Sequence, residues 1–205
     1  MRSHASLMCD ISDWQAGFDA YAYRRSGRVA IMIKACEGRG FAGASHHAQR
    51  AIEAHGAGLR VVHYAFLDAS PGADQAAVLR QAVEPVWRPG DRLCADVEVQ
   101  GAPGALGAWR AALEASGHSG LLLYTYRGFT GSWMGAAKGM GLILADYGWS
   151  QLPSLLDRLA AHGLPLAGRQ FTDGVSGADP HMAAGISGPV DCTRLTSWGR
   201  RLIEA

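Results

Sequence analysis

The stretch "LCADVEVQ" (residues 93–100) carries two acidic side chains in an otherwise small and apolar run. A short apolar run of this kind is typical of a buried β-strand. Asp96 and Glu98 are two residues apart, so their side chains point to the same side of such a strand. Two carboxylates directed toward a core indicate a site of acid–base chemistry. The alternative is a buried network in which Lys34 or Arg92 pairs with both acids.

Similar apolar runs recur along the chain and alternate with helical patterns. The eight candidate strands cover residues 7–12, 29–35, 59–66, 92–99, 120–126, 141–147, 166–172 and 188–192. Ala-rich segments with a period near 3.6 predict helices at 44–56, 73–87 and 104–117, with a further candidate at 152–163, a loop at 173–187 and a last helix near the end of the chain.

Alternation of strands and helices implies an α/β fold with a parallel sheet, because parallel strands need long crossover connections. Eight strands in 205 residues predict a closed, irregular TIM-like barrel with some helices missing, in a single domain spanning 1–205. The second architecture considered is an open doubly wound sheet. Its usual glycine-rich phosphate loop is absent after the first strand, where the sequence is "DISDWQAG".

The amino-acid composition argues against several classes of function. The net charge is +1, from 19 basic and 18 acidic residues, and no basic stripe indicates a nucleic-acid partner. No stretch is apolar enough to insert into a membrane, and the N-terminus lacks the apolar segment of a signal peptide. The four cysteines have no zinc-type spacing, so we expect no metal and no cofactor. We further expect a monomer.

Polar and aromatic residues lie where the predicted strands end, which is where β/α barrels place their functional groups. In chain order these residues are Asp10, Lys34 with Glu37, Tyr64, Asp96 with Glu98, Tyr124, Asp146 with Tyr147, Gln170 and Asp191. Carboxylates serve acid–base chemistry, and aromatic faces suit sugar rings. The set therefore favours a carbohydrate substrate.

Asp96 and Glu98 are predicted to divide the acid–base work. Two like charges in a partly dry pocket cannot both ionise easily, so one keeps its proton toward neutral pH. Glu98 is longer and nearer the mouth, and we assign it the role of general acid. Asp96, which lies deeper, is expected to stay ionised.

The chain resembles the glycoside hydrolase family 25 muramidases, which are lysozymes of bacteria, phages and some fungi. The segments that carry the resemblance are "DISDWQ" (10–15), "IMIKACEG" (31–38), "GLRVVHYAF" (58–66), "ADVE" (95–98), "LYTYRGF" (123–129), "LILADY" (142–147), "RQFT" (169–172) and "GPVDC" (188–192). Their order and spacing, which span nearly the whole chain, are more specific than any one of them. Cys36, Ala65 and Ile143 depart from residues usual in the family and put substrate preference in doubt.

The resemblance implies a (β/α)5(β)3 barrel with eight strands and about five helices. It also implies cleavage of the β-1,4 bond from N-acetylmuramic acid to N-acetylglucosamine in peptidoglycan, with retention of configuration. Glu98 would be the catalytic acid, and Asp10, Asp96 and Asp191 would complete an acidic floor. Substrate-binding residues would be Tyr64, Tyr124, Tyr147, Gln170, Asp146 and Glu37. The nucleophile is either the substrate's own N-acetyl group or an enzyme carboxylate.

Two other functions remain open on the sequence alone: an inactive sugar-binding barrel and a chitinase-like hydrolase of N-acetylglucosamine polymers. We expect no cell-wall-binding module. Without a recognised signal, the protein would reach the wall as a phage endolysin released from the host cytoplasm or by another export route.

Cys9 and Cys192 neighbour Asp10 and Asp191 and would lie close together behind the acidic floor, because the first and last strands of a barrel are adjacent. A disulfide needs Cα atoms ~4.4–6.8 Å apart, a geometry that strand neighbours seldom meet. We therefore predict two buried, reduced thiols.

Overall fold

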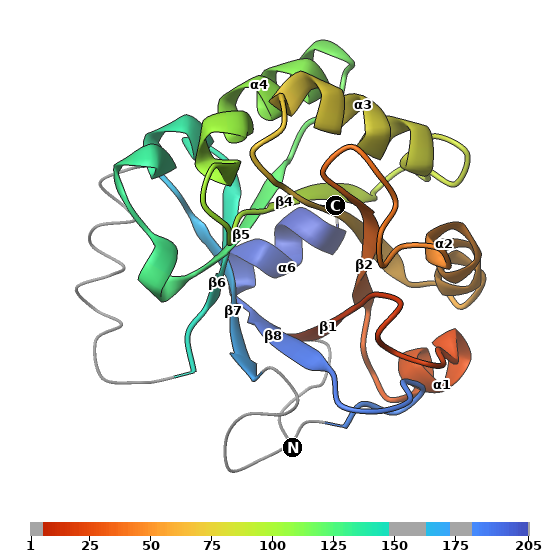
Figure 1. Cartoon of the computed structure of the whole chain (residues 1–205). Helices are drawn as coiled ribbons and strands as arrows, with labels where there is room; N and C mark the ends of the chain where they lie inside the picture. The colour runs from red at the N-terminus through yellow and green to blue at the C-terminus, as the bar shows by residue number, and fades with distance from the viewer. Residues whose placement is uncertain (1–5, 148–162, 173–181, 205) are drawn as a thin grey trace.

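A computed structural model describes residues 6–147, 163–172 and 182–204 of the chain, and eight strands in it close into one barrel in sequence order (Figure 1). The strands are β1 (Leu7–Ile11), β2 (Ala30–Glu37), β3 (Arg60–Phe66), β4 (Arg92–Asp96), β5 (Leu122–Tyr126), β6 (Gly141–Ala145), β7 (Leu166–Thr172) and β8 (Asp191–Leu195). The predicted closed barrel is confirmed, and the open sheet is excluded.

Five α-helices lie in the described part of the chain, together with two short 3-10 helices. They are α1 (Ala20–Arg25), α2 (His47–Gly56), α3 (Gly72–Val83), α4 (Ala102–Ala115), α6 (Ser197–Glu204), η2 (Arg127–Phe129) and η3 (Ser132–Ala137). The three Ala-rich segments form helices as predicted. The helix predicted at 152–163 and most of the loop predicted at 173–187 lie outside the described residues. None of the described helices has the length and apolar character needed to cross a bilayer.

The direction of the last strand differs from the prediction. The sequence placed it at 188–192 with Asp191 at its end, whereas β8 begins at Asp191 and runs antiparallel to both β1 and β7. The other strand pairs are parallel. Because β8 is reversed, its first residue lies at the same end of the barrel as the last residues of the other strands. Asp191 therefore still reaches the barrel mouth.

Side chains alternate between the barrel interior and the surrounding helices, as the period of a strand requires. In β4, Cys94 belongs to the interior cluster, while Leu93 and Ala95 pack on the outside in the cluster that contains Trp109 of α4. Helix α6 contributes Ile203 to the interior cluster and is seen through the barrel in Figure 1. Interior packing and α6 close one end, so a site can form only at the other end.

Cys9 and Cys192 form a disulfide, which corrects the prediction of two reduced thiols. The two residues face each other in the antiparallel register of β1 and β8, with Cα atoms 4.2 Å apart. Residues opposite each other in non-hydrogen-bonded antiparallel pairs come closest together, at ~4.5 Å. The prediction failed because it did not anticipate this antiparallel pairing. Both cysteines are fully buried on the outer side of the barrel, as expected.

Candidate active site

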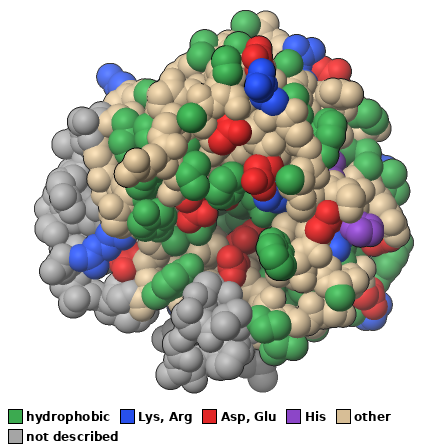
Figure 2. Space-filling model, viewed as in Figure 1, with side chains coloured by type: hydrophobic (Ala, Val, Ile, Leu, Met, Phe, Trp, Pro, Cys, Tyr) green, Lys and Arg blue, Asp and Glu red, His purple; other side chains and the backbone are tan. Residues whose placement is uncertain are grey.

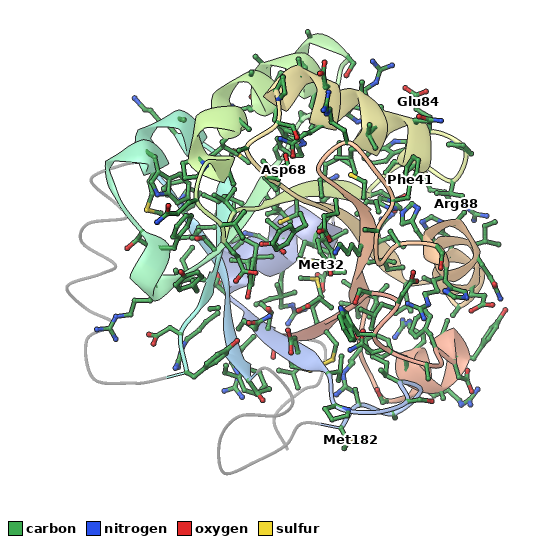
Figure 3. The ribbon with its side chains drawn as sticks, viewed as in Figure 1. Met32, Phe41, Asp68, Glu84, Arg88 and Met182 are labelled. Atoms are coloured by element: carbon green, nitrogen blue, oxygen red, sulfur yellow. A yellow bond between two sulfur atoms is a disulfide. The ribbon has the colours of Figure 1, made fainter. Side chains whose placement is uncertain are left out.

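A cavity of about 500 Å³ opens at the carboxyl ends of the parallel strands. Figure 2 shows acidic side chains gathered in a central hollow that is bordered by apolar side chains. Met32, in the middle of the barrel in Figure 3, is among the lining residues. The lining consists of Asp10, Ser12, Trp14, Gln15, Met32, Lys34, Tyr64, Phe66, Asp96, Glu98, Tyr124, Pro189 and Asp191. All four acids proposed from the sequence as catalytic therefore line one cavity.

Asp96 is the last residue of β4 and is buried, while Glu98 lies two residues beyond the strand and is half-buried. Burial, followed by the charges of Glu98 and Asp10, raises the pKa of Asp96 well above its usual value. Burial also raises the pKa of Glu98, and the negative charge of Asp191 adds to the effect. A hydrogen bond between Asp96 and Glu98 works the other way on Glu98 and lowers its pKa.

The division of protons predicted for these two acids, with Asp96 ionised and Glu98 protonated, stays a prediction. Burial raises the pKa of both carboxyls. When two acids interact this closely, the proton belongs to the pair rather than to one residue. Through their hydrogen bond, Asp96 can supply a proton to Glu98, which has the shorter path to solvent.

Asp10, in β1, is tied to a hydrogen-bonded group centred on Gln170 of β7. The Gln170 side-chain amide donates to Asp10 Oδ2 at 3.1 Å, and its Oε1 accepts from the hydroxyls of Tyr124 and Tyr147, each at 2.8 Å. Burial raises the pKa of Asp10 to about 6, with a smaller contribution from the charge of Glu98, while the Gln170 hydrogen bond opposes the rise. Asp10 can therefore change its charge near neutral pH.

The two tyrosines of the cavity wall are held as hydrogen-bond donors. Burial, followed by the charges of Asp10, Asp96 and Asp191, raises the pKa of Tyr64 well above 10. Burial acts on Tyr124 in the same direction. Both phenols therefore stay protonated over the working range of any hydrolase. Tyr147, predicted as a third sugar contact, is half exposed and joins the group through Gln170.

The alternative of a closed ion-pair network around Asp96 and Glu98 does not match the contacts. The Lys34 ammonium lines the cavity but forms its ion pair with Glu37. Arg92 donates to the backbone oxygens of Leu202 and Asp91, and Leu202 belongs to α6 at the closed end of the barrel. Lys34 still acts at a distance, because its charge opposes the rise in the pKa of Asp96.

Four of the six predicted substrate contacts are not part of the cavity lining: Tyr147, Gln170, Asp146 and Glu37. Asp146 is buried just after β6, its carboxylate 3.8 Å from the Arg127 guanidinium. Glu37 reaches the site only through Lys34.

Sequence reasoning missed Trp14 and Phe66 as lining residues. Trp14 could have been found in the quoted segment "DISDWQ". Among the described residues, no cluster of His, Cys, Asp and Glu fits a metal ion.

Comparison with known proteins places the fold, although no protein-family profile and no curated protein matches the chain. The chain is similar to the lysozyme of Streptomyces coelicolor, with 20% identity over 96% of this chain and 94% of that one and a TM-score of 0.70. It is also similar to the catalytic domain of endolysin ply40 from bacteriophage P40 of Listeria monocytogenes (20% identity, 97% of each chain, TM-score 0.73). A family 25 glycosyl hydrolase from Bacillus anthracis aligns over 95% of this chain and 90% of its own at 16% identity, with a TM-score of 0.70. The chain therefore has the barrel fold of the family 25 glycoside hydrolases.

Proposed function

We propose that this protein is a peptidoglycan hydrolase, a lysozyme that cleaves the β-1,4 bond from N-acetylmuramic acid to N-acetylglucosamine. The observation that carries the proposal is the convergence of Asp10, Asp96, Glu98 and Asp191 on one cavity at the mouth of a barrel that known lysozymes share. A pocket in which buried carboxyls hold a proton near neutral pH is suited to protonating a glycosidic oxygen. Tyr64 and Tyr124, which line the cavity, add neutral hydrogen-bonding groups for sugar hydroxyls and amides.

In the proposed mechanism Glu98 gives its proton to the glycosidic oxygen as the bond from that oxygen to the anomeric carbon breaks. The bonding electrons leave with the oxygen, and positive charge develops on the sugar ring. Glu98 is left as a carboxylate, while ionised Asp10 and Asp191 stabilise the positive charge. The N-acetyl oxygen of the substrate or an enzyme carboxylate then attacks the anomeric carbon. Water completes the reaction with net retention, after Glu98 has removed its proton.

The test uses purified protein, bacterial cell walls and identification of the new reducing ends. Parent protein should release ends that carry muramic acid. Glu98→Gln should lower the rate by about 10³-fold or more while the protein still binds walls, because the amide keeps the shape but has no proton to donate. Glu53→Gln, an acid on α2 outside the cavity, is the matched control and should leave the rate unchanged.

Other outcomes would contradict the proposal. Reducing ends made of N-acetylglucosamine would indicate a chitinase-like hydrolase, and binding without release by the parent would indicate a sugar-binding barrel. Undiminished release by Glu98→Gln would remove Glu98 from the mechanism.

A further inference from the structure

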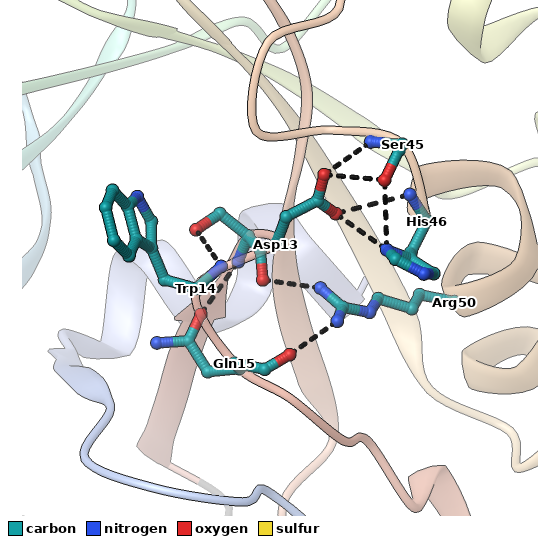
Figure 4. Close-up of polar contacts among 7 residues, drawn as sticks. Asp13, Trp14, Gln15, Ser45, His46 and Arg50 are labelled. Carbon is teal, nitrogen blue, oxygen red and sulfur yellow. Dashed lines mark hydrogen bonds and ion pairs between the residues drawn. The ribbon is translucent and has the colours of Figure 1, made fainter.

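Trp14 stands at the rim of the acidic cavity with an unusually exposed indole. Its side chain is 89% exposed and belongs to the lining of the cavity. It lies in the loop between β1 and α1 (Figure 4). Single exposed aromatic residues are common on protein surfaces, but an exposed indole in the lining of a polar cavity offers an apolar face to a ligand bound there.

The loop that carries Trp14 is fixed on one side by Asp13. The Asp13 carboxylate accepts from the backbone N–H and hydroxyl of Ser45 at 2.8 and 2.7 Å, and it contacts His46 Nδ1 at 3.0 Å (Figure 4). These residues directly precede α2, whose own N-cap residue, His46, makes no side-chain capping bond. Burial would raise the pKa of Asp13, but the hydrogen bonds from His46 and Ser45 outweigh it and hold that pKa below its usual value. Asp13 therefore stays ionised and bonded.

Arg50 of α2 fixes the same loop at two further points. Its guanidinium donates to the carbonyl oxygens of Ser12 and Gln15, at 2.5 and 2.6 Å. These two acceptors lie before and after Trp14 in the chain. Within the loop, the Trp14 N–H donates to Ser12 Oγ at 3.3 Å, and the Ser12 N–H donates to Gln15 Oε1 at 2.9 Å. The backbone beneath the exposed side chain is thus held by Arg50 of α2, by Ser45 and His46 just before α2, and by side chains of the loop itself.

We propose that Trp14 is a preorganised stacking platform for a pyranose ring of the glycan, held in place by Asp13 and Arg50. The identification of the ligand as a sugar rests on the proposed function. A sugar presents a face of C–H bonds that matches the electron-rich face of an indole. Because Trp14 lines the rim of the cavity that holds the four carboxylates, a ring stacked on it would belong to the same glycan strand as the bond to be cleaved, at a distance from the reacting atoms. Because the loop is already ordered, binding loses little entropy in fixing it.

The first test measures binding without turnover. In a Glu98→Gln background, the dissociation constant for a soluble tetrasaccharide from peptidoglycan is measured for Trp14→Ala, for Trp14→Phe and for the unaltered loop. We expect Trp14→Ala to weaken binding by about tenfold or more and Trp14→Phe to recover most of it, since a stacked aromatic contributes about that factor. Tyr21→Ala is the control, because Tyr21 is 57% exposed but does not line the cavity.

Kinetics and fluorescence separate this inference from the proposed function. In the active protein, Trp14→Ala should raise KM and leave kcat within about twofold, as expected for loss of binding away from the reacting atoms. The tetrasaccharide should change indole fluorescence in the Glu98→Gln protein but not when Trp14 is also replaced by Phe. Sugar binding that depends on Trp14 would support the platform even if the parent cleaved no wall. Equal affinity for Trp14→Ala and the unaltered loop would overturn it.

The role of the Asp13 and Arg50 contacts is tested with Trp14 unchanged. Arg50→Gln and Asp13→Ala should each weaken tetrasaccharide binding several-fold at a temperature where circular dichroism shows a native fold. When these two variants and the parent are labelled with 5-fluorotryptophan, the fluorine NMR signal of Trp14 should be broadened by conformational exchange in each variant but not in the parent. If both folded variants bind the tetrasaccharide as tightly as the parent and give the same fluorine signal, the Asp13 and Arg50 contacts are not needed to hold the loop.

Discussion

Asp96 and Asp10 illustrate how burial sets chemistry at the scale of single residues. Each carboxyl lies in the cavity wall, and burial is the largest cause of its raised pKa. An acid whose pKa is higher in the folded than in the unfolded chain binds more protons when folded. Its ionisation therefore costs stability, and the cost grows as pH rises from 3.8 toward the folded value. Each of these carboxylates should therefore lower the free energy of unfolding at neutral pH.

The substitution Asp10→Asn tests this cost. The variant should be more stable than the parent by about 1–2 kcal/mol at pH 7–8, because Asn carries no charge and can still accept from Gln170. The gain should shrink as pH falls below about 6 and vanish only well below pH 3.8, where Asp10 is neutral in both states. Urea unfolding as a function of pH measures the difference, and wall hydrolysis should fall in the same variant. A gain that is undiminished at pH 3.5 would assign the effect to packing instead of charge.

At the scale of elements, a buried chain of polar groups joins α2, β3 and the turn before β4. His47 Nε2 lies 2.8 Å from His63 Nδ1, and His63 Nε2 lies 3.2 Å from Asp91, which also contacts His55 at 3.0 Å. Burial, with the charge of His63, lowers the pKa of His47 to about 3, and burial lowers the pKa of His63. The helix and the strand are thus joined by two histidines that remain largely uncharged. Burial would raise the pKa of Asp91, but hydrogen bonds from His63 and Arg88 hold that pKa below its usual value.

This network predicts acid sensitivity of the fold. In the unfolded chain His47 takes up a proton below about pH 6.5, but in the folded chain only near pH 3. The unfolded state therefore binds more protons across that interval, and stability falls as pH drops. At pH 5 the loss due to His47 should be about 2 kcal/mol relative to pH 7. Urea unfolding of His47→Gln should show a smaller loss between pH 7 and pH 5; an unchanged loss would assign the acid sensitivity to other groups.

At the scale of the whole molecule, the barrel is closed by a covalent bond between its first and last strands. The disulfide joins residues 183 apart in sequence, and the next residues along, Asp10 and Asp191, are register partners in the same strand pair. A disulfide that closes so long a loop strongly reduces the conformational entropy of the unfolded chain. It also opposes the separation of two strands that carry facing carboxylates.

Loss of this bond should weaken the fold without changing its architecture. Cys9→Ala combined with Cys192→Ala should lower the free energy of unfolding by about 2–5 kcal/mol. Cys36→Ala is the control, because Cys36 is a buried free thiol. Alkylation of the denatured parent without reductant should label two cysteines, Cys36 and Cys94. Labelling of all four would show that the bond does not form in solution.

The sequence by itself determined the features that depend on near neighbours in the chain. Alternation in "LCADVEVQ" placed Asp96 and Glu98 on one side, and period and spacing predicted the strands, three helices and the class of barrel. The set of residues at strand ends followed from the same periodicity. Local patterns suffice there, because helix and strand periods are set by backbone geometry.

Only the tertiary structure decided which of those residues meet and in what state. The reversal of β8, the disulfide between Cys9 and Cys192, and the support of the Trp14 loop by Arg50 all depend on contacts between distant segments. The raised pKa of Asp96 arises from its burial beside Glu98 and Asp10. Register between strands, burial and electrostatic coupling are properties of the packed molecule, and a one-dimensional pattern does not contain them.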